Sequence, residues 1–165
     1  MPAETQDRRT RQGMGDHRRL AALSVMAGLA MAAAPVAGFA QTLTARLSPV
    51  PLTVTQQSTV AGLGSARAMV TGGHVAIRGA FDGLRSPATS AQIHRAPKGL
   101  RGPVILELPV VRAGDGTQGT IKGEFDLTPA QRDDLTAGRW YIQLNSEKAA
   151  DGNLWGWLLP KETRR

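Results

Sequence analysis

Short runs in which apolar and polar residues alternate, separated by glycine and proline, dominate the chain from residue 41 onwards. In residues 42–47 the alternation places Leu43, Ala45 and Leu47 on one face, because neighbouring side chains of a strand point to opposite faces. Several short strands with regular turn signals predict an all-β sandwich or barrel. The predicted strands are residues 42–47, 64–70, 74–81, 90–94, 103–108, 120–127, 140–144 and 154–159.

The same alternation predicts which side chains form the core. Along residues 74–81, Val75, Ile77 and Phe81 are expected to face inwards and Arg78 outwards. In residues 120–127 the predicted inward set is Ile121, Phe125 and Leu127, and the outward set is Lys122, Glu124 and Asp126. The predicted connections are a tight glycine turn at residues 71–73 and loops at residues 48–58, 113–119 and 146–152.

One short helix is expected between the strands. Residues 128–131, Thr-Pro-Ala-Gln, have the composition of a capping box with proline at the first helical position. Gly138 then supplies a stop signal for the C-terminal end. The predicted class is therefore all-β with one short helix.

Residues 1–40 have the organisation of a secretory signal, with a basic start, an apolar middle and a small-residue cleavage site. Residues 20–34 contain no charge, and residues 38–40, Gly-Phe-Ala, predict cleavage before Gln41. A retained membrane anchor is the alternative, since about 20 apolar residues can span a bilayer. Arg18 and Arg19 leave the twin-arginine export route open as an alternative to the general secretory (Sec) route. The expected location is the periplasm or the exterior of a bacterium.

Charge and cysteine content narrow the classes of partner. The whole chain carries 20 Lys+Arg against 13 Asp+Glu, a net charge of +7. The predicted signal holds five of the basic and three of the acidic residues, which leaves the domain at +5. These charges are dispersed along the sequence, whereas nucleic-acid binding predicts a basic cluster, so no nucleic-acid partner is expected. The chain has no cysteine and therefore no disulfides or thiolate chemistry.

No catalytic motif is present in the sequence. There is no G-x-S-x-G, no phosphate-binding loop and no dinucleotide fingerprint. Asp133 and Asp134 lie on the predicted helix and are expected to be solvated. Beyond the signal the only histidines are His74 and His94, too few for a three-histidine metal centre, and His74 is expected to lie exposed beside its turn. We therefore expect no enzyme activity and no cofactor.

Residues 91–104, A-Q-I-H-R-A-P-K-G-L-R-G-P-V, resemble the signature of the CHRD (chordin-type) domain family. Residues 127–131, L-T-P-A-Q, residues 135–142, L-T-A-G-R-W-Y-I, and residues 152–158, G-N-L-W-G-W-L, are similar to later motifs of that family. The resemblance implies an immunoglobulin-like Greek-key β-sandwich of extracellular or envelope proteins. It places a CHRD-like domain at residues 41–160, followed by a charged tail at residues 161–165.

The chain departs from the family where the family carries histidines and charges. The resemblance aligns family histidines with Gln92, His94 and Asn145, so one of three remains. It aligns a glutamate, an arginine and a glutamine with Asn153, Trp155 and Trp157. One histidine cannot supply the three or four ligands that zinc usually takes, so metal binding is not expected.

Amide and aromatic side chains replace that cluster, and they form the candidate ligand-binding site: Gln92, His94, Tyr141, Gln143, Asn145, Asn153, Trp155 and Trp157. Aromatic rings beside amides suit a sugar or a protein partner. The indoles could instead form a second small core under a loop, which is the favoured interpretation. The predicted function is an exported, non-enzymatic binding or scaffolding module whose partner is a protein or glycan of the cell envelope, with no membrane span after signal cleavage. The alternatives are a degenerate metal-binding sandwich, similar to superoxide dismutase, and a glycan-binding domain that uses the aromatic face.

Overall fold

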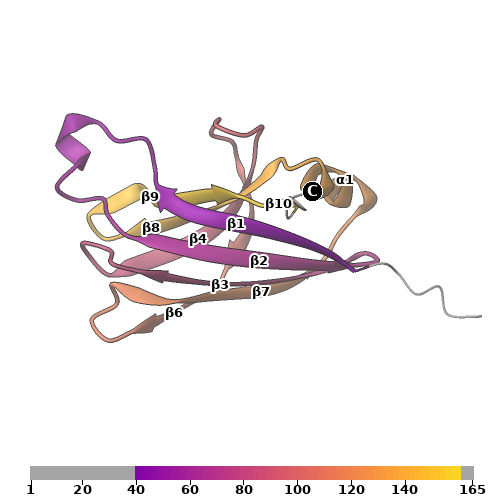
Figure 1. The fold of residues 1–165 in the computed structure, drawn as a ribbon, viewed down its shortest axis with the longest axis horizontal. Helices are drawn as coiled ribbons and strands as arrows, with labels where there is room; N and C mark the ends of the chain where they lie inside the picture. The colour runs from indigo at the N-terminus through magenta and orange to yellow at the C-terminus, as the bar shows by residue number, and fades with distance from the viewer. Residues whose placement is uncertain (1–39, 161–165) are drawn as a thin grey trace, which may run out of the picture. The chain divides into compact units, whose positions relative to one another are not determined.

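The computed structural model describes residues 40–160, which form ten antiparallel strands and one α-helix (Figure 1). The predicted signal, apart from Ala40, and the predicted tail lie outside the described residues. In chain order the elements are β1 (Gln41–Pro49), η1 (Val54–Gln56), β2 (Leu63–Thr71), β3 (His74–Asp82), β4 (Ala88–Arg95), β5 (Val104–Leu108), β6 (Val110–Ala113), β7 (Gln118–Asp126), α1 (Pro129–Thr136), β8 (Trp140–Ser146), β9 (Ala149–Trp157) and β10 (Leu159–Pro160).

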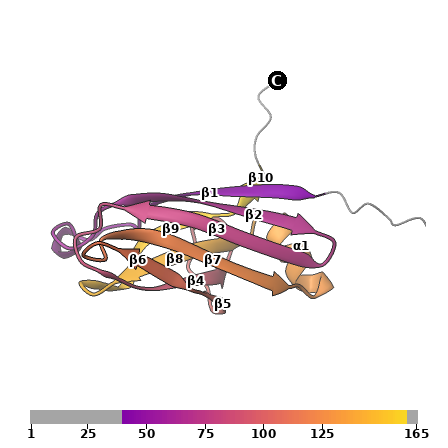
Figure 2. The ribbon, with the colours of Figure 1, turned by 90° about the horizontal axis from the view of Figure 1, so that it is seen from below.

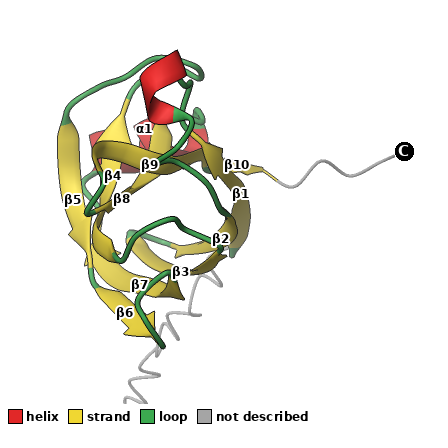
Figure 3. Ribbon diagram, turned by 90° about the vertical axis from the view of Figure 1, so that its left-hand side faces the viewer, coloured by secondary structure: helices red, strands yellow, loops and turns green. Residues whose placement is uncertain are grey.

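The strands follow one another around the molecule in the order β5-β4-β8-β9-β1-β2-β3-β7-β6, with β10 also paired to β1. Seen end-on, they encircle a common interior (Figure 3). The all-β sandwich with one short helix is therefore confirmed, as a nearly closed, barrel-like sheet. The immunoglobulin-like Greek key remains a prediction.

Two segments carry the chain between the two halves of the sheet. Strand β1 pairs with β2 along most of its length, but its last residues, Ser48 and Pro49, pair with β9. On the opposite side, β5 pairs with β4 and β6 pairs with β7. Pro109 separates β5 from β6, and proline interrupts a ladder because it has no amide donor. The chain passes from one half of the sheet to the other at this residue, and β5 and β6 lie end to end in Figure 2.

The predicted strands are present, and the structure adds three features at their ends. Strand β6 occupies residues that the sequence analysis left between a strand and a loop. The 3-10 turn η1 lies in the expected loop of residues 48–58, and β9 begins at Ala149, inside the loop expected at residues 146–152.

In the turn between β6 and β7, hydrogen bonds from Thr117 to Asp115 lower the pKa of the Asp115 carboxyl.

The core forms from the inward faces that the alternation predicts. Leu43, Leu47, Val75 and Ile77 are completely or almost completely buried, and Phe81 is 3% exposed. The same cluster contains further residues from both halves of the sheet, from α1 and from the link between β9 and β10: Ile93, Ile121, Leu135, Trp140, Ile142, Leu144, Leu154 and Leu158. Apolar burial at about 25 cal/mol per Å² is the main stabilising contribution available to a chain without disulfides.

Helix α1 begins and ends as the sequence predicts. The Thr128 hydroxyl accepts from the Gln131 amide at 3.3 Å, and the Gln131 side chain accepts from the Thr128 amide at 2.9 Å. Gly138 adopts a φ of 69°, which a side chain would make costly. Leu135 anchors the helix in the core with no exposed surface. Among residues 40–160, no helix is long and apolar enough to cross a membrane.

Replacing Thr128 by alanine should lower the free energy of unfolding by about 1 kcal/mol, because the capping hydroxyl is lost. Urea denaturation measures the change. Thr136→Ala, on the exposed last turn of the same helix, is the matched control and should change the stability by less than about 0.5 kcal/mol. Equal losses in the two variants would contradict the capping role.

Candidate functional site

Four aromatic rings form a continuous row on the outer face of β4, β8 and β9. The register places His94 opposite Tyr141, and Tyr141 opposite Trp157. The His94 and Tyr141 rings stack with centroids 4.8 Å apart, and Trp157 lies 4.8 Å from Tyr141 on its other side. Trp155 completes the row at 4.7 Å from Trp157. Such pairs stabilise beyond their buried area, so the row is a packed unit.

The loop of residues 96–103 covers most of this row through three hydrogen bonds. His94 Nδ1 donates to the Gly102 carbonyl at 2.8 Å, and the Gly102 amide donates to the Tyr141 hydroxyl at 3.1 Å. Trp157 Nε1 donates to the Ala96 carbonyl at 3.2 Å. Tyr141, Trp157 and Ala96 are accordingly buried as a second small cluster. For Trp157 the structure therefore supports the second-core interpretation.

Gly102 permits the close approach of this loop to β4. A Cβ atom at this position would collide with the Arg95 carbonyl group and would lie 3.0 Å from the Ala96 Cβ. Only glycine fits the loop in this path. Gly102 thus allows the loop to cover the aromatic row.

Trp155 differs from Trp157 because it is only partly buried. The Arg101 guanidinium lies 5.9 Å from the centre of its ring, within the range of a cation–π interaction. Arg101 also donates to the Asp151 carbonyl at 2.8 Å, which links the covering loop to the start of β9. Trp155 is therefore held in place while part of its indole stays accessible.

The amides of the candidate site divide into three groups. Gln143 donates to Asn145 at 3.0 Å, and Asn145 donates to the Ser90 hydroxyl at 3.0 Å, so these three form one partly buried chain of hydrogen bonds. Gln92 bonds to Glu107 of β5 at 2.8 Å. Asn153, fully buried, donates to the Ala61 carbonyl at 3.1 Å in the loop before β2. The site residues therefore lie on neighbouring strands, but Gln92 and Asn153 bond to partners outside the set.

Several buried polar atoms of the site have no hydrogen-bond partner within the described chain. They are His94 Nε2, Gln143 Oε1 and Asn153 Oδ1. A buried polar atom without a partner costs about 1–3 kcal/mol. The two atoms that belong to His94 and Gln143 lie on the face that carries the aromatic row. This face therefore has two polar atoms next to its rings whose hydrogen-bonding ability is not used within the described chain.

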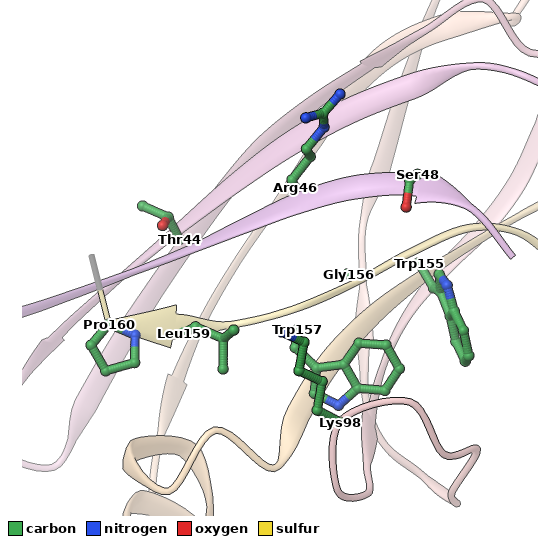
Figure 4. A pocket seen from close by; sticks show the side chains of 9 residues that line it. All are labelled: Thr44, Arg46, Ser48, Lys98, Trp155, Gly156, Trp157, Leu159 and Pro160. Carbon is green, nitrogen blue, oxygen red and sulfur yellow. The ribbon is translucent and has the colours of Figure 1, made fainter. Parts of the chain in front are cut away.

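A groove of about 540 Å³ runs beside the accessible edge of the indoles, between β1 and the β9–β10 segment (Figure 4). Trp155 and Trp157 form one side of it, and Lys98 of the covering loop lies close to them in this view. Arg46 extends from β1 away from the indoles in the same view. The remaining lining combines the small or polar Thr44, Ser48 and Gly156 with the apolar Leu159 and Pro160.

The groove shows which residues the sequence analysis missed. Arg46 and Ser48 belong to the first strand, and Lys98 and Arg101 to the loop of residues 96–103. The signal was partly visible, because Arg46 falls on the outward face of its strand. What the sequence could not show is that the last residues of β1 pair with β9 and bring that face beside Trp155.

Histidines and carboxylates do not gather at this site. Across residues 40–160, no group of three or more His, Asp or Glu side chains lies together in an arrangement that could hold a metal ion. His74 lies on β3, exposed beside its turn as expected, where it bonds to Asp126 at 3.0 Å. His94 is instead engaged with the covering loop. The described site is therefore aromatic, amide-rich and bordered by cations.

A family model of the CHRD domain matches residues 40–158, which are nearly all of the described residues. No curated protein and no solved structure was found to match the chain. The matched range contains every residue of the aromatic row and all but the end of the groove.

Proposed function

The chain belongs to the CHRD domain family, and from this premise we propose that it is an exported, non-enzymatic domain that binds glycan of the bacterial cell envelope. Export is inferred from the basic start, apolar middle and small-residue site of residues 1–40. The groove beside Trp155 is the proposed binding site. The observation that carries the proposal is that Trp155 is partly accessible while its neighbours Tyr141 and Trp157 are buried.

An accessible indole beside polar groups suits a sugar. The apolar face of a sugar ring packs against an aromatic ring, and its hydroxyls need hydrogen-bond partners close by. Thr44 and Ser48 offer hydroxyl groups in the groove, and Lys98 offers an ammonium. Trp155 is braced by Trp157 and Arg101, so little side-chain entropy remains to be lost on binding.

The arrangement favours binding over catalysis. A general acid or base must lie within hydrogen-bond reach of its substrate, and the groove is lined by no histidine, aspartate or glutamate among the described residues. His94 lies under the covering loop, 7% exposed. The cations and hydroxyls of the groove can orient a ligand without a residue suited to move a proton at neutral pH.

Trp155→Ala is expected to weaken glycan binding by roughly 30-fold, since an aromatic anchor contributes about 2 kcal/mol. Affinity electrophoresis measures this, with neutral pullulan in one gel and acidic polygalacturonate in another. The unfolding free energy should fall by less than in a core variant, because Trp155 is partly exposed.

Trp155→Phe is the matched control, because it keeps an aromatic face, and it should retain most of the affinity. The proposal fails if neither polysaccharide slows the wild-type protein. It also fails if Trp155→Ala migrates like the wild type in both gels.

A further inference from the structure

Three basic side chains stand directly opposite one another on the outer face of β2, β3 and β7. The register pairs Arg67 with Arg78, and Arg78 with Lys122. All three are exposed. Neighbouring strands lie about 4.8 Å apart, so this row, which we call the cation row, repeats a positive charge at that interval. Like charges directly opposite one another destabilise a sheet, so this arrangement lowers the stability of the fold. A binding role for the row would explain why the sequence carries it.

The neighbouring residues do not neutralise the cation row. Within residues 40–160, Glu124 on β7 is the one carboxylate that pairs with it, at 3.7 Å from Arg78, and both side chains are mostly exposed. Asp82, at the far end of β3, accepts from the Gly83 amide. Arg67 and Lys122 have no ion-pair partner among the described residues. The row therefore keeps a strong positive potential on this face.

A second groove, of about 530 Å³, lies within this face. Arg46, Arg67 and Arg78 border it, and small residues that include Ser65, Gly79 and Ala80 line its base. A guanidinium presents a planar fork of donors that fits a carboxylate with two hydrogen bonds. Small residues at the base let an extended ligand approach the backbone. The geometry therefore suits an anionic chain lying flat on the sheet.

This second groove is continuous with the groove beside Trp155. Thr44 and Arg46 line both. Thr44 pairs with Arg67 on one side and with Leu159 on the other, so Thr44 connects the cation row to the strand that borders the indoles. In Figure 4 the Arg46 side chain points away from the indoles, and its place in both linings puts it between the aromatic and the basic surfaces.

We propose that this face binds an acidic polysaccharide, with its carboxylates on Arg46, Arg67, Arg78 and Lys122 and one sugar ring beside Trp155. The inference rests on the proposed function, because it names the class of glycan that the Trp155 groove would hold. An acidic polysaccharide combines repeated carboxylates with apolar sugar faces, and both surfaces are present here. Thr44, Ser65 and Ala80 lie beside the row, and the exposed Leu63 and Met69 share the outer face of β2 with Arg67. A lipid surface would take such apolar side chains into the bilayer, so binding to lipid vesicles is the competing outcome that the test includes.

The test uses the purified protein in pullulan and polygalacturonate gels, with Arg67→Gln/Arg78→Gln as the variant. The wild type should bind polygalacturonate at least tenfold more tightly than pullulan, and added salt should weaken that binding. The variant should lose at least tenfold affinity for polygalacturonate and keep its pullulan affinity. It should also unfold at a higher temperature than the wild type, because the opposed charges are removed.

Arg85→Gln/Arg132→Gln is the matched control, since it removes two exposed arginines elsewhere and has the same net charge as the cation-row variant. It should change the polygalacturonate affinity less than twofold. The proposal is overturned if the control loses as much affinity as the cation-row variant, or if pullulan and polygalacturonate bind equally. It is also overturned if phosphatidylglycerol vesicles or single-stranded oligothymidylate bind more tightly than polygalacturonate.

The same gels separate this inference from the proposed function. If Trp155→Ala binds polygalacturonate normally while the cation-row variant does not, the Trp155 groove is wrong as the binding site. The carboxylate contacts of the cation row then stand, and the sugar ring beside Trp155 does not. If Trp155→Ala loses both polysaccharides while the cation-row variant loses neither, the groove stands and the cation row is wrong.

Discussion

Replacing Trp157 by alanine is expected to lower the free energy of unfolding by about 3–5 kcal/mol. The side chain is only 9% exposed, its indole nitrogen bonds to the Ala96 carbonyl, and its ring packs against Tyr141. The truncation would leave a cavity under the loop of residues 96–103 and an unpartnered carbonyl beside it. Guanidinium denaturation followed by far-UV circular dichroism measures the loss.

Trp155→Ala is the matched control for this prediction, since it removes the same side chain two residues away. Its cost should be smaller by at least about 1 kcal/mol, because Trp155 already contacts solvent and its removal leaves an open surface. If both variants lose about 3–5 kcal/mol, Trp155 belongs to the second core together with Trp157. Equal and small losses would assign both indoles to the ligand-binding face.

Alternation predicted the strands well wherever one face is buried. Residues 42–47 and 74–81 have one clean apolar face, and both are strands whose predicted inward side chains are buried. Strand β6 escaped prediction because its residues are mostly exposed and carry no clear alternation. The start of β9 was taken for a loop for a similar reason, since Ala149–Trp157 opens with polar and small residues.

The capping box shows why the helix was the easiest element to locate. Thr128, Pro129 and Gln131 interact with one another within a single turn, so local chemistry alone specifies the start of α1. The closure of the sheet has no such local signal. It depends on β1 pairing with two different strands, β2 and β9, and that choice is made by packing across the whole core.

The sequence predicted which strands and which face carry the candidate site, but not how much of that face is accessible to a ligand. Because side chains alternate, His94, Tyr141 and Trp157 were expected on one face, and the registers of β4, β8 and β9 place them side by side. A loop over the indoles was the favoured interpretation, but the sequence could not show that residues 96–103 form it. That step depends on Gly102, whose backbone approaches Arg95 too closely for a side chain. The loop buries Tyr141 and Trp157 and leaves Trp155 partly accessible.

The cation row was hidden for a different reason. Arg67, Arg78 and Lys122 are far apart in the sequence, and each falls singly on an outward strand position. Dispersed charge along a β-protein can therefore be concentrated charge in space, since strand register and not sequence distance decides which side chains are neighbours. The lack of a basic cluster in the sequence therefore did not exclude a basic surface in this fold.

Gly156→Ala is expected to lower the free energy of unfolding by about 1–3 kcal/mol through overpacking. A Cβ atom at this position would collide with the Arg46 carbonyl and would lie 3.0 Å from Leu47 Cδ2. Both groups belong to β1, so β9 would have to move away from β1 where the two halves of the sheet meet. Since Gly156 also lines the groove between Trp155 and Trp157, the same shift should alter the tryptophan fluorescence of the folded protein.

Gly73→Ala is the matched control for this last substitution. Gly73 lies exposed in the turn between β2 and β3, and the nearest atom to an added Cβ is the Leu127 carbonyl oxygen at 3.6 Å, an ordinary contact. Its stability should change by no more than about 0.5 kcal/mol. A Gly156→Ala variant that unfolds at the same denaturant concentration as this control would mean that β1 and β9 have room between them. The groove would then not depend on the close approach of these two strands.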